Sequence, residues 1–326
     1  MSMVGRSKKS KIKMDLKNKK ILLTGGAGFL GKEVYKKLLE HGAKEEDIFV
    51  PRSKEHDLRK KEVCDELVKG KDIVIHLAAK VGGLWFHVGR QAEFFYENSI
   101  MALNLVDSAH KAGVKKFVGL GSVCEYPDDA PIPFKESDLW KGYPSKITSP
   151  YGLSKRMMLV ASQAYHDQYN FDAIHLLMIN LYGPGDDFDP KSSHAIPALI
   201  RRVFEAKRDG INFIDVWGDG TASREFLYVE DAAEGIVLAT KKYDKPEPVN
   251  LGAGREIPIV DLVQLICRHM DFKGEIRWDT SKVGGQLRRM LDTNLAEKEF
   301  GFKAETSFEN GLKNTIDWFI KNQPKS

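Results

Sequence analysis

The fold is decided by residues 19–43, which read KKILLTGGAGFLGKEVYKKLLEHGA. The segment ILLTG is a short apolar run of residues compatible with a β-strand. Leu30, Val34, Leu38 and Leu39 then recur at the spacing of an amphipathic helix. A strand joined to a helix by a tight turn is the repeating unit of a parallel α/β sheet. The sequence therefore predicts that the chain opens such a sheet.

The turn between this strand and helix is rich in glycine. It reads TGGAGFLG, and Gly25, Gly28 and Gly31 give the spacing G-x-x-G-x-x-G. Glycines in this context permit a tight turn, close approach of the backbone to a pyrophosphate, and close packing of the helix on the sheet. The amino terminus of the helix then faces the phosphates. We predict a dinucleotide-binding loop here.

The same alternation of strands and helices continues to about residue 184. Strands are expected at 47–50, 72–79, 114–122 and within 171–184, and helices at 63–70, 91–112 and about 150–168. No hairpin turns separate these strands, which indicates a parallel sheet with helices on both faces. The Pro-rich polar stretch at 126–150 is long enough to be a functional loop.

Beyond residue 183 the predicted elements are shorter and more mixed. We therefore expect an α/β fold, with a doubly wound parallel (Rossmann) sheet and a smaller C-terminal mixed α/β lobe that binds substrate. The expected division is a basic flexible tail at 1–18, a nucleotide-binding domain at 19–182, and a substrate lobe at 183–326. Some of the third segment is expected to cross back to the sheet.

The composition is that of a soluble globular protein: 42% of the 326 residues are hydrophobic and 29% are charged. No apolar run is long enough to span a membrane, and the first residues lack the apolar core of a secretory signal. The first twenty residues carry eight Lys/Arg and one Asp, a charge of +7; the whole chain is +4, which leaves −3 for the rest. We interpret this basic segment as a solvated tail, or as an extension before Met14, and expect neither a nucleic-acid nor a membrane partner.

Cysteine usage points to a reducing compartment. Cys64, Cys124 and Cys267 are far apart and form no C-x-x-C pair. A disulfide framework and a zinc site are therefore not expected, and no metal is assigned. Free thiols favour a cytoplasmic location.

The end of the second strand indicates which dinucleotide binds. An NAD site needs an acidic side chain there to hold the ribose 2′-hydroxyl. This chain reads FVPRSKEHDL, with Arg52, Ser53 and Lys54 in that region and Glu55 as the next acid. A cationic cluster suits a 2′-phosphate, so NADP(H) is favoured over NAD.

A second motif, SPYGLSK, places Tyr151 and Lys155 four residues apart and hence on one face of a helix. A free tyrosine has a pKa near 10. A neighbouring lysine ammonium and an oxidised nicotinamide ring are expected to favour the phenolate and to move this pKa toward neutral pH. About thirty residues earlier, Ser122 ends a predicted strand and is expected to bridge the substrate oxygen and the tyrosine hydroxyl.

These motifs, taken together, resemble those of the extended short-chain dehydrogenases/reductases. Within that superfamily the chain resembles the GDP-L-fucose synthase family, whose members are GDP-4-keto-6-deoxymannose 3,5-epimerase/4-reductases. The similarity runs from about residue 19 to 320. Its specific stretches are HLAAKVGG (76–83), LGSVCEYP (120–127), NLYGPGDDFDPKSSHAIPALIRR (180–202), VWGDGTASREFLYVED (216–231) and WDTSKVGGQLRRMLD (278–292).

The resemblance implies a role for Cys124, two residues beyond Ser122. A 4-keto group makes the C3 and C5 protons acidic, and inversion of a carbon needs a base on one face and an acid on the other. In the family these roles fall to the cysteine of G-S-x-C-x-Y-P and the histidine of S-S-H, here Cys124 and His194. A thiolate near positive charge is a competent base, and histidine exchanges a proton near neutral pH. The other histidines, His76 and His175 among them, are interpreted as core or surface residues.

The resemblance also implies the binding residues. The expected cofactor set is Gly25, Gly28, Phe29, Leu30, Gly31, Arg52, Asp57, Leu77, Ala78, Ala79, Asn98, Lys155, Asn180, Leu181 and His194. The expected substrate set for a GDP-sugar is Val81, Gly82, Arg202, Trp217, Arg224 and Arg289. Arginine suits the diphosphate because its planar fork of donors matches phosphate oxygens. Where the family commonly reads Lys-Pro-Asp-Gly, this chain reads Lys282-Val-Gly-Gly285, so Gly284 replaces the acid.

The expected activity is NADPH-dependent 3,5-epimerisation and 4-keto reduction of a GDP-4-keto-6-deoxyhexose. The alternatives are a relative that acts on another GDP-4-ketosugar or that only reduces, a redox-neutral NDP-sugar 4-epimerase, and a non-catalytic sensor of the NADPH/NADP ratio. The basic end of the second strand and Cys124 argue against the 4-epimerase, and the presence of both Tyr151 and Lys155 argues against the sensor. A homodimer is expected through the helices near 91–112 and 150–168.

Overall fold

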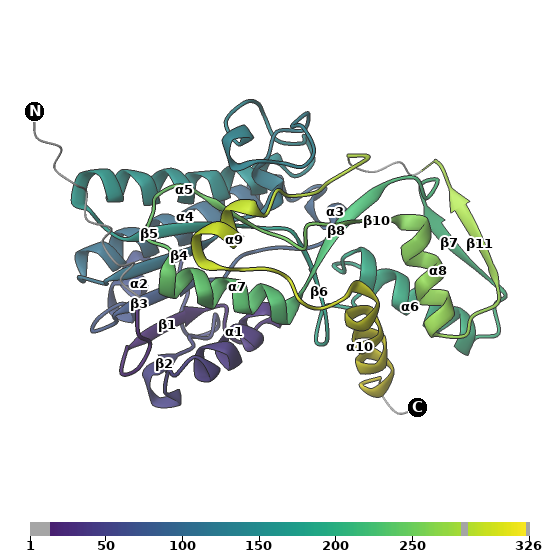
Figure 1. The fold of residues 1–326 in the computed structure, drawn as a ribbon, viewed down its shortest axis with the longest axis horizontal. Coiled ribbons are helices and arrows are strands. Elements are labelled where there is room, and N and C mark those ends of the chain that lie inside the picture. Colours follow the sequence, from purple (N-terminus) through teal and green to yellow (C-terminus); the bar gives the residue numbers. More distant parts are fainter. Residues whose placement is uncertain (1–13, 282–285, 324–326) are drawn as a thin grey trace, which may run out of the picture.

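A six-stranded parallel sheet in the order β2-β1-β3-β4-β5-β9 forms the larger lobe of the computed structural model (Figure 1). The structure describes residues 14–281 and 286–323. The strands of this sheet are β1 Ile21–Thr24, β2 Ile48–Phe49, β3 Ile73–His76, β4 Lys116–Leu120, β5 Ala173–Met178 and β9 Val249–Leu251. The predicted parallel α/β fold is confirmed, although the second strand spans two residues rather than the four expected at 47–50.

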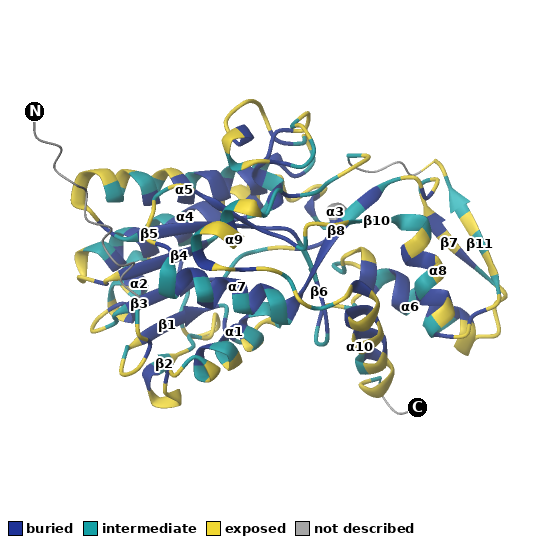
Figure 2. Cartoon of the chain, in the orientation of Figure 1, coloured by how far each residue is buried: buried dark blue, intermediate teal, exposed yellow. Residues whose placement is uncertain are grey.

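Alternation along the strands divides the larger lobe into two apolar layers. In β1, Ile21 and Leu23 join the core cluster that also contains Val34 of α1, whereas Leu22 joins a cluster with Leu105 of α4. Successive strand residues point to opposite faces, so a continuous apolar run must be covered on both sides. Burying each such side chain stabilises the fold by about 1.5–3 kcal/mol. Figure 2 shows the strands as buried between helices whose outer surfaces are exposed.

The helices that cover the sheet come from both halves of the chain. Those preceding β5 are α1 Phe29–Glu40, α2 Lys61–Leu67, α3 Leu84–His87 and α4 Gln91–Lys111, with α5 Ser149–Tyr169 leading into the strand. Short 3₁₀ turns lie at Glu45–Asp47, Val123–Glu125 and Glu136–Asp138. The predicted helices at 91–112 and 150–168 thus match α4 and α5 to within a residue or so.

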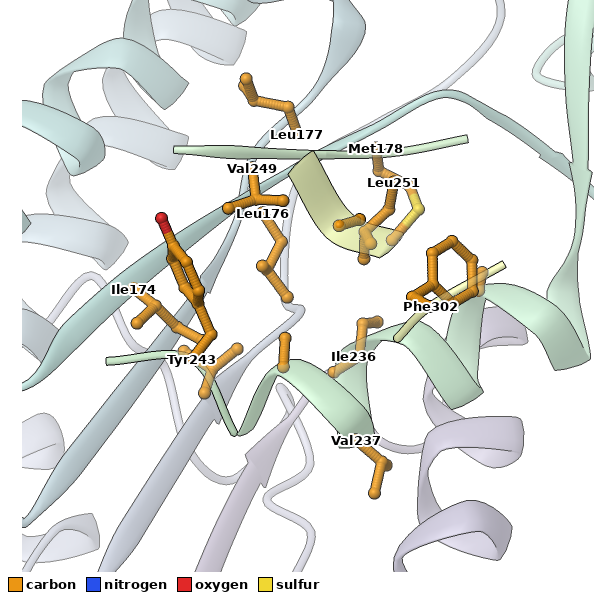
Figure 3. Packing of buried hydrophobic residues seen from close by; sticks show 14 of the residues in the cluster. Ile174, Leu176, Leu177, Met178, Ile236, Val237, Tyr243, Val249, Leu251 and Phe302 are labelled. Atoms are coloured by element: carbon orange, nitrogen blue, oxygen red, sulfur yellow. The ribbon is translucent and has the colours of Figure 1, made fainter. Parts of the chain in front are cut away.

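A later part of the chain returns to the sheet. After β6, helix α7 (Val229–Lys242) packs on α1, and β9 then pairs with β5 as the last strand of the sheet. Side chains of β5, α7 and β9 meet in one core, among them Leu176, Ile236 and Leu251 (Figure 3). The core of the larger lobe is therefore completed by residues beyond 182.

The smaller lobe holds two small sheets and three helices. Strands β6 Asn180–Tyr182, β8 Ser223–Tyr228 and β10 Glu256–Pro258 form one sheet, and β7 Phe213–Trp217 and β11 Glu275–Asp279 form the other. Its helices are α6 Ala195–Arg208, α8 Ile259–His269 and α10 Phe308–Lys321, whereas the last remaining helix, α9 Asn294–Phe300, packs on α7 and β9 of the larger lobe. Of these, α6, α8 and α10 enclose a separate apolar cluster that includes Ile200, Ile266 and Leu312.

Part of the basic amino-terminal segment, which was expected to be a tail, packs on the rest of the protein. The flexible tail was predicted for residues 1–18, but Leu16 is fully buried in the main core and the Met14 amide donates to the Lys241 carbonyl at 2.9 Å. An apolar side chain in an otherwise basic segment is stabilised by this burial. The prediction is therefore wrong for residues 14–18, and residues 1–13 lie outside the described part.

Candidate active site

One large cavity lies at the carboxyl ends of β1, β3, β4 and β5, where open parallel sheets bind their ligands. Its volume is about 1070 Å³. The predicted residues that line it are Gly25, Gly28, Phe29, Leu30, Gly31, Arg52, Asp57, Leu77, Ala78, Ala79, Val81, Gly82, Ser122, Cys124, Tyr151, Lys155, Asn180, Leu181 and His194. The fold thus gathers segments that are up to 169 residues apart in the sequence, from Gly25 to His194, around one space.

The glycine loop at one end of the cavity is tightly constrained. Gly25 has a φ of +74°, and a Cβ added there would lie 2.7 Å from the Ala78 amide nitrogen. A Cβ on Gly31 would lie 2.1 Å from the Gly25 carbonyl oxygen. Helix α1 begins directly after Gly28, and its first turn carries no acidic residue. Its free amide groups and dipole therefore suit a phosphate, as a dinucleotide site requires.

The segment after β2 forms the adjoining wall. Arg52 lines the cavity and is exposed. Asp57 accepts hydrogen bonds from the Arg59 guanidinium at 2.9 Å, and this guanidinium lowers the pKa of the Asp57 carboxyl. Arg59 also lines the cavity, a placement that the sequence did not suggest. Two arginines in the segment that follows β2 thus line this wall, an arrangement that suits an additional phosphate.

Ser122, Cys124 and Glu125 share one turn directly after β4. The Ser122 hydroxyl accepts from the Cys124 amide at 3.2 Å, and the Ser122 amide donates to the Glu125 carboxylate at 2.7 Å. These two bonds form a capping box on a single 3₁₀ turn. Gly152 of α5 packs so closely that a Cβ there would lie 2.0 Å from the Cys124 carbonyl oxygen. The glycine after Tyr151 is therefore needed for α5 to reach this turn.

Tyr151 and Lys155 project from one face of α5 into the same cavity. The Lys155 ammonium donates to the Leu120 carbonyl at 2.7 Å and lies 5.8 Å from the centre of the Tyr151 ring. Burial lowers the pKa of Lys155 to about 8, and the charge of Glu125 opposes this shift. Both side chains are almost completely buried.

The pKa of Tyr151 is raised in the protein alone, whereas the prediction concerned the site with an oxidised nicotinamide ring bound. Burial raises it above its ordinary value, the charges of Cys124 and Glu125 raise it further, and a hydrogen bond with Ser122 opposes the rise. Loss of solvation of the phenolate is the largest cause, and the Lys155 ammonium is directed to the Leu120 carbonyl. Tyr151 is thus a protonated phenol at neutral pH, the form required of a proton donor.

His194 also lines the cavity, directly before α6. Burial lowers the pKa of its imidazole, and the nearby Asp187 carboxylate opposes this. His87 of α3 also lines the cavity, and its ring centre lies 5.7 Å from that of Tyr151. Burial lowers the pKa of His87, and the charge of His194 lowers it further. The candidate acid therefore sits among His87, Asp187 and Asp186, whose pKa burial raises to about 7.

The predicted substrate arginines lie outside the cavity wall, in the smaller lobe. Arg202 donates to the Asp215 carbonyl, and its guanidinium carbon lies 5.8 Å from the centre of the Trp217 ring. Burial lowers the pKa of Arg224 to about 10, and the charge of Arg289 lowers it further, so the two cations are close. Arg289 also approaches the Cys124 sulfur, with 4.0 Å between Nη1 and Sγ. Arg289 thus links this cationic region to the cavity.

Two other predicted positions have a different outcome. Asn98 does not line the cavity; its amide donates to the Lys80 carbonyl at 3.0 Å and accepts from the Lys80 amide at 2.8 Å, so it fixes the loop after β3. Gly284 and the rest of Lys282-Val-Gly-Gly285 lie outside the described residues. His76 is a core residue, as interpreted, with its Nδ1 2.8 Å from the Thr24 hydroxyl.

Several lining residues were missed by the sequence reasoning, namely Lys80, His87, Glu97, Met101, Asp186, Asp187 and Ser192. Asp186 and Asp187 lie inside the stretch 180–202 that carries the family resemblance, which was the available signal. His175, interpreted only as core or surface, is fully buried and lies 3.1 Å from both Glu125 carboxylate oxygens. Nothing in the local pattern predicts this contact across fifty residues.

Comparisons with known proteins place the chain in a family. The family model described as the NAD dependent epimerase/dehydratase family matches residues 21–252. The chain belongs to this family. It is 37% identical to GDP-L-fucose synthase of Sinorhizobium fredii, over 94% of this chain and 97% of that protein. It is also 37% identical to GDP-L-fucose synthase 1 of Arabidopsis thaliana, over 95% of each chain.

The structural comparison agrees. A crystal structure of a GDP-L-fucose synthetase from Naegleria fowleri bound to NADP superposes with a TM-score of 0.86 at 28% identity, covering 96% of this chain and 98% of that one. The resemblance to the GDP-L-fucose synthases, predicted from the motifs, is confirmed. Within residues 14–281 and 286–323, no helix is long and apolar enough to cross a membrane, and no cluster of His, Cys, Asp or Glu could hold a metal ion.

Proposed function

We propose that this epimerase/dehydratase family member binds NADPH and converts a GDP-4-keto-6-deoxyhexose, by inversion at C3 and C5 and reduction at C4, to GDP-L-fucose or a close relative. The observation that carries the proposal is the shared cavity. Its lining includes the glycine loop, the Ser122, Tyr151 and Lys155 set, and the Cys124 and His194 pair. An enzyme that only reduces needs the glycine loop and the Ser122, Tyr151 and Lys155 set, but it does not need the Cys124 and His194 pair.

The cofactor site fits NADPH. Because Gly25 and Gly31 have no room for side chains, the backbone of the loop itself can approach the cofactor. The start of α1 can hold the pyrophosphate. Arg52 and Arg59 suit the 2′-phosphate, and Lys155 is expected to contact the nicotinamide ribose. The chemistry supplied by NADPH when bound is the two-electron reduction of the C4 carbonyl.

Epimerisation needs a base and an acid on opposite faces of the sugar ring. The Cys124 thiolate removes the proton at C3 or C5, which gives an enolate stabilised by the 4-keto group, and His194 returns a proton to the other face. Nη1 of Arg289 lies 4.0 Å from the Cys124 sulfur, so this guanidinium is the cation beside the proposed base. Ser122 and Tyr151 hydrogen-bond the enolate oxygen during this step.

Reduction reuses Ser122 and Tyr151. Because burial raises the pKa of Tyr151, the phenol keeps its proton at neutral pH and gives it to the C4 oxygen as that oxygen becomes an alcohol. Lys155 keeps a positive charge close by below its pKa of about 8. Ser122 positions the oxygen through its own hydroxyl. Arg202, Trp217 and Arg224 are proposed to bind the GDP part, beyond the end of the cavity.

The test is to incubate the protein with GDP-4-keto-6-deoxymannose and NADPH, in water and in deuterium oxide. NADPH absorbance reports reduction, and proton NMR of the product reports configuration and deuterium content. We expect loss of NADPH, an L-galacto product, and deuterium at C3 and C5. Cys124→Ser should abolish the exchange, whereas Cys267→Ser, a distant buried cysteine, serves as the matched control.

Other outcomes separate the alternatives. Retained D-manno or D-talo configuration with NADPH loss would make the protein a 4-reductase and contradict the roles given to Cys124 and His194. No NADPH loss with this substrate, but loss with a dideoxy or heptose GDP-4-ketosugar, would change the substrate. Interconversion of C4 epimers without net oxidation would indicate a 4-epimerase.

We further propose a cytoplasmic homodimer built on α4 and α5. Helices α4 and α5 pack on each other and carry exposed apolar side chains, Phe95 and Tyr96 on α4 and Val160 and Tyr169 on α5. All three cysteines are unpaired, which suits a reducing compartment. Sedimentation equilibrium tests the dimer, and Tyr96→Glu with Val160→Glu should yield monomers.

A further inference from the structure

The Ser122 to Glu125 turn rests on a buried pair formed by Glu125 and His175. Both side chains are completely inaccessible to solvent. Nε2 of His175 lies 3.1 Å from each Glu125 carboxylate oxygen, and the same carboxylate accepts from the Ser122 amide at 2.7 Å. A Cβ on Gly121 would lie 2.3 Å from His175 Nε2 and 2.5 Å from Glu125 Oε1. The pair therefore packs directly against the backbone of Gly121 and Ser122.

The hydrogen-bond inventory assigns a charge to this pair. Nδ1 of His175 is buried and has no partner among the described residues. In a doubly protonated ring, Nδ1 would carry a buried N–H without an acceptor. That state costs more free energy than a neutral ring whose Nδ1 is an unpaired acceptor. The neutral tautomer with its proton on Nε2 donates to Glu125 and avoids that cost. Glu125 then remains an anion, and the pair carries one net negative charge.

This charge acts on two buried cations, Arg156 and Lys155, and of the two Lys155 lines the cavity. Its ammonium donates to the Leu120 carbonyl, the residue next to the Gly121 and Ser122 backbone on which the Glu125 carboxylate packs. Lys155 is 4% exposed, so its charge needs a compensating anion. Arg156 of α5, the next residue, donates to the Glu125 carbonyl at 2.7 Å and caps the other side of the turn.

We propose that the Glu125–His175 pair is a positioning element of the active centre: it fixes the Ser122–Cys124 turn and supplies the negative charge that keeps Lys155 an ammonium. Glu125 and His175 do not line the cavity and touch no reacting atom. Of the measurements that test this charge effect, only the dependence of kcat on pH relies on the function proposed above. The other ionisable groups around Glu125 and Lys155 are Tyr151 and Arg156 of α5, His76 of β3, and Cys124 and Tyr126 of the turn.

The direction of the effect follows from the Lys155 titration. Burial lowers the pKa of Lys155 to about 8, and Glu125 raises it against that trend. Removing the Glu125 charge should therefore lower the pKa of Lys155 further, by about one unit for a charge at close range. A step that needs the ammonium is lost as the pH rises through this pKa. In Glu125→Gln, kcat should fall at a pH about one unit lower than in the wild type.

The experiment compares Glu125→Gln with Asp172→Asn. The first variant keeps the size of the side chain and an oxygen for the Ser122 amide. The second removes the carboxylate beside a different buried lysine, Lys116, at the far end of the same strands, and is the matched control. The profile of kcat against pH should shift in Glu125→Gln, with about fivefold lower kcat at pH 8, and should keep its position in Asp172→Asn. An unshifted Glu125→Gln profile would overturn the charge role.

A second measurement does not depend on the enzyme's substrate. Urea unfolding of the cofactor-free protein is followed from pH 6 to 9. Below about pH 7, Lys155 is protonated in both folded proteins and benefits from the Glu125 charge only in the wild type, so Glu125→Gln has its full stability deficit. Between about pH 7 and 8 only the wild-type lysine keeps its proton, and the deficit shrinks. Above pH 8 the wild-type lysine is neutral, so the part of the deficit due to charge disappears. A deficit that is constant with pH contradicts the proposal even if the protein proves inactive toward the ketosugar.

A third measurement uses the wild-type protein and guards against a variant that does not fold. The ¹⁵N spectrum of His175 at pH 7.5 should show a neutral ring protonated on Nε2. A doubly protonated ring would make the pair neutral overall and would remove the argument for a net charge. If the wild type shows no turnover, the proposed function fails, while the unfolding and NMR results still decide the inference.

Discussion

Strand β4 has a buried ionisable pair at each of its ends, and the two pairs serve different purposes. At the amino end, Lys116 is 2% exposed, donates to both Asp172 carboxylate oxygens at 2.8 Å, and also donates to the Tyr243 carbonyl. Beyond the carboxyl end, Glu125 meets His175 of β5. Both pairs join β4 to β5 or its immediate flank, and both require buried charge.

The difference lies in what surrounds each pair. Neither Lys116 nor Asp172 lines the cavity, and the donors of Lys116 are used up within the protein. The Glu125 carboxylate instead influences the pKa values of Lys155 and Tyr151, which do line the cavity. From this difference we infer that the Lys116 and Asp172 pair serves the stability of this fold, whereas the charge of the Glu125 and His175 pair serves the proposed chemistry.

The largest expected effect tests the proposed chemistry at the carboxyl end of β4. Tyr151→Phe removes the proton donor, and kcat for NADPH oxidation should fall by about 10²–10⁴-fold. Exchange of deuterium at C3 and C5 should persist, because Cys124 and His194 remain. The measurement is steady-state absorbance with parallel NMR. Reduction at a rate close to that of the wild type would show that another group donates the proton.

The next effect tests the amino end. Lys116→Met leaves Asp172 and the Tyr243 carbonyl without their shared donor, and should lower the free energy of unfolding by about 3 kcal/mol. This value lies at the low end of the range because the Asp172 side chain keeps 28% exposure. Urea denaturation measures the loss. The kcat per folded molecule should not change, and a large fall in kcat would erase the proposed distinction between the two ends.

A third variant inserts one methyl group beside the carboxyl-end pair. Gly121→Ala places a Cβ within 2.5 Å of both Glu125 and His175, so the pair and the Ser122 turn must move. We expect kcat to fall by about tenfold or more, because small displacements of catalytic groups are costly. Gly119→Ala, whose Cβ would meet the flexible Met158 side chain at 3.0 Å, is the control on the same strand. Equal kinetics for the two variants would contradict the positioning role.

The smallest expected effect concerns the kind of donor that Glu125 needs. His175→Gln offers a neutral amide N–H in place of the ring N–H, so the hydrogen bond and the net charge are both retained. Because a neutral hydrogen bond contributes about 0.5–1.5 kcal/mol, kcat should change by less than about threefold and its pH profile should not move. A shifted profile in this variant would mean that His175 carries a charge in the folded protein.

Much of the site was predictable because its motifs are local. The glycine loop, the Tyr151 and Lys155 spacing and the Ser122 and Cys124 turn each lie within a few consecutive residues, and the fold brings them to one cavity. The parallel sheet followed in the same way from alternating strands and helices. His194 came from the family resemblance alone, since nothing near it in sequence marks an acid.

What was missed depends on contacts between distant segments. Glu125 and His175 are fifty residues apart, and only the register of β4 against β5 brings them together. The direction of the Tyr151 pKa depends on burial, which the Tyr-x-x-x-Lys spacing does not report. The packing of Leu16 was hidden by the lysines around it, because one apolar residue gives no periodic pattern.

The return of the chain to the larger sheet has a consequence for how this protein can be divided. A fragment that ends at residue 182 would lack β9 and α7, so β5 would become an open sheet edge and the apolar face around Leu176 would be uncovered (Figure 3). Exposed edges of this kind template aggregation. Residues up to 182 therefore do not form a unit that can be moved to another protein, because α7 and β9, which follow the first strands of the smaller lobe, complete the core of the larger lobe.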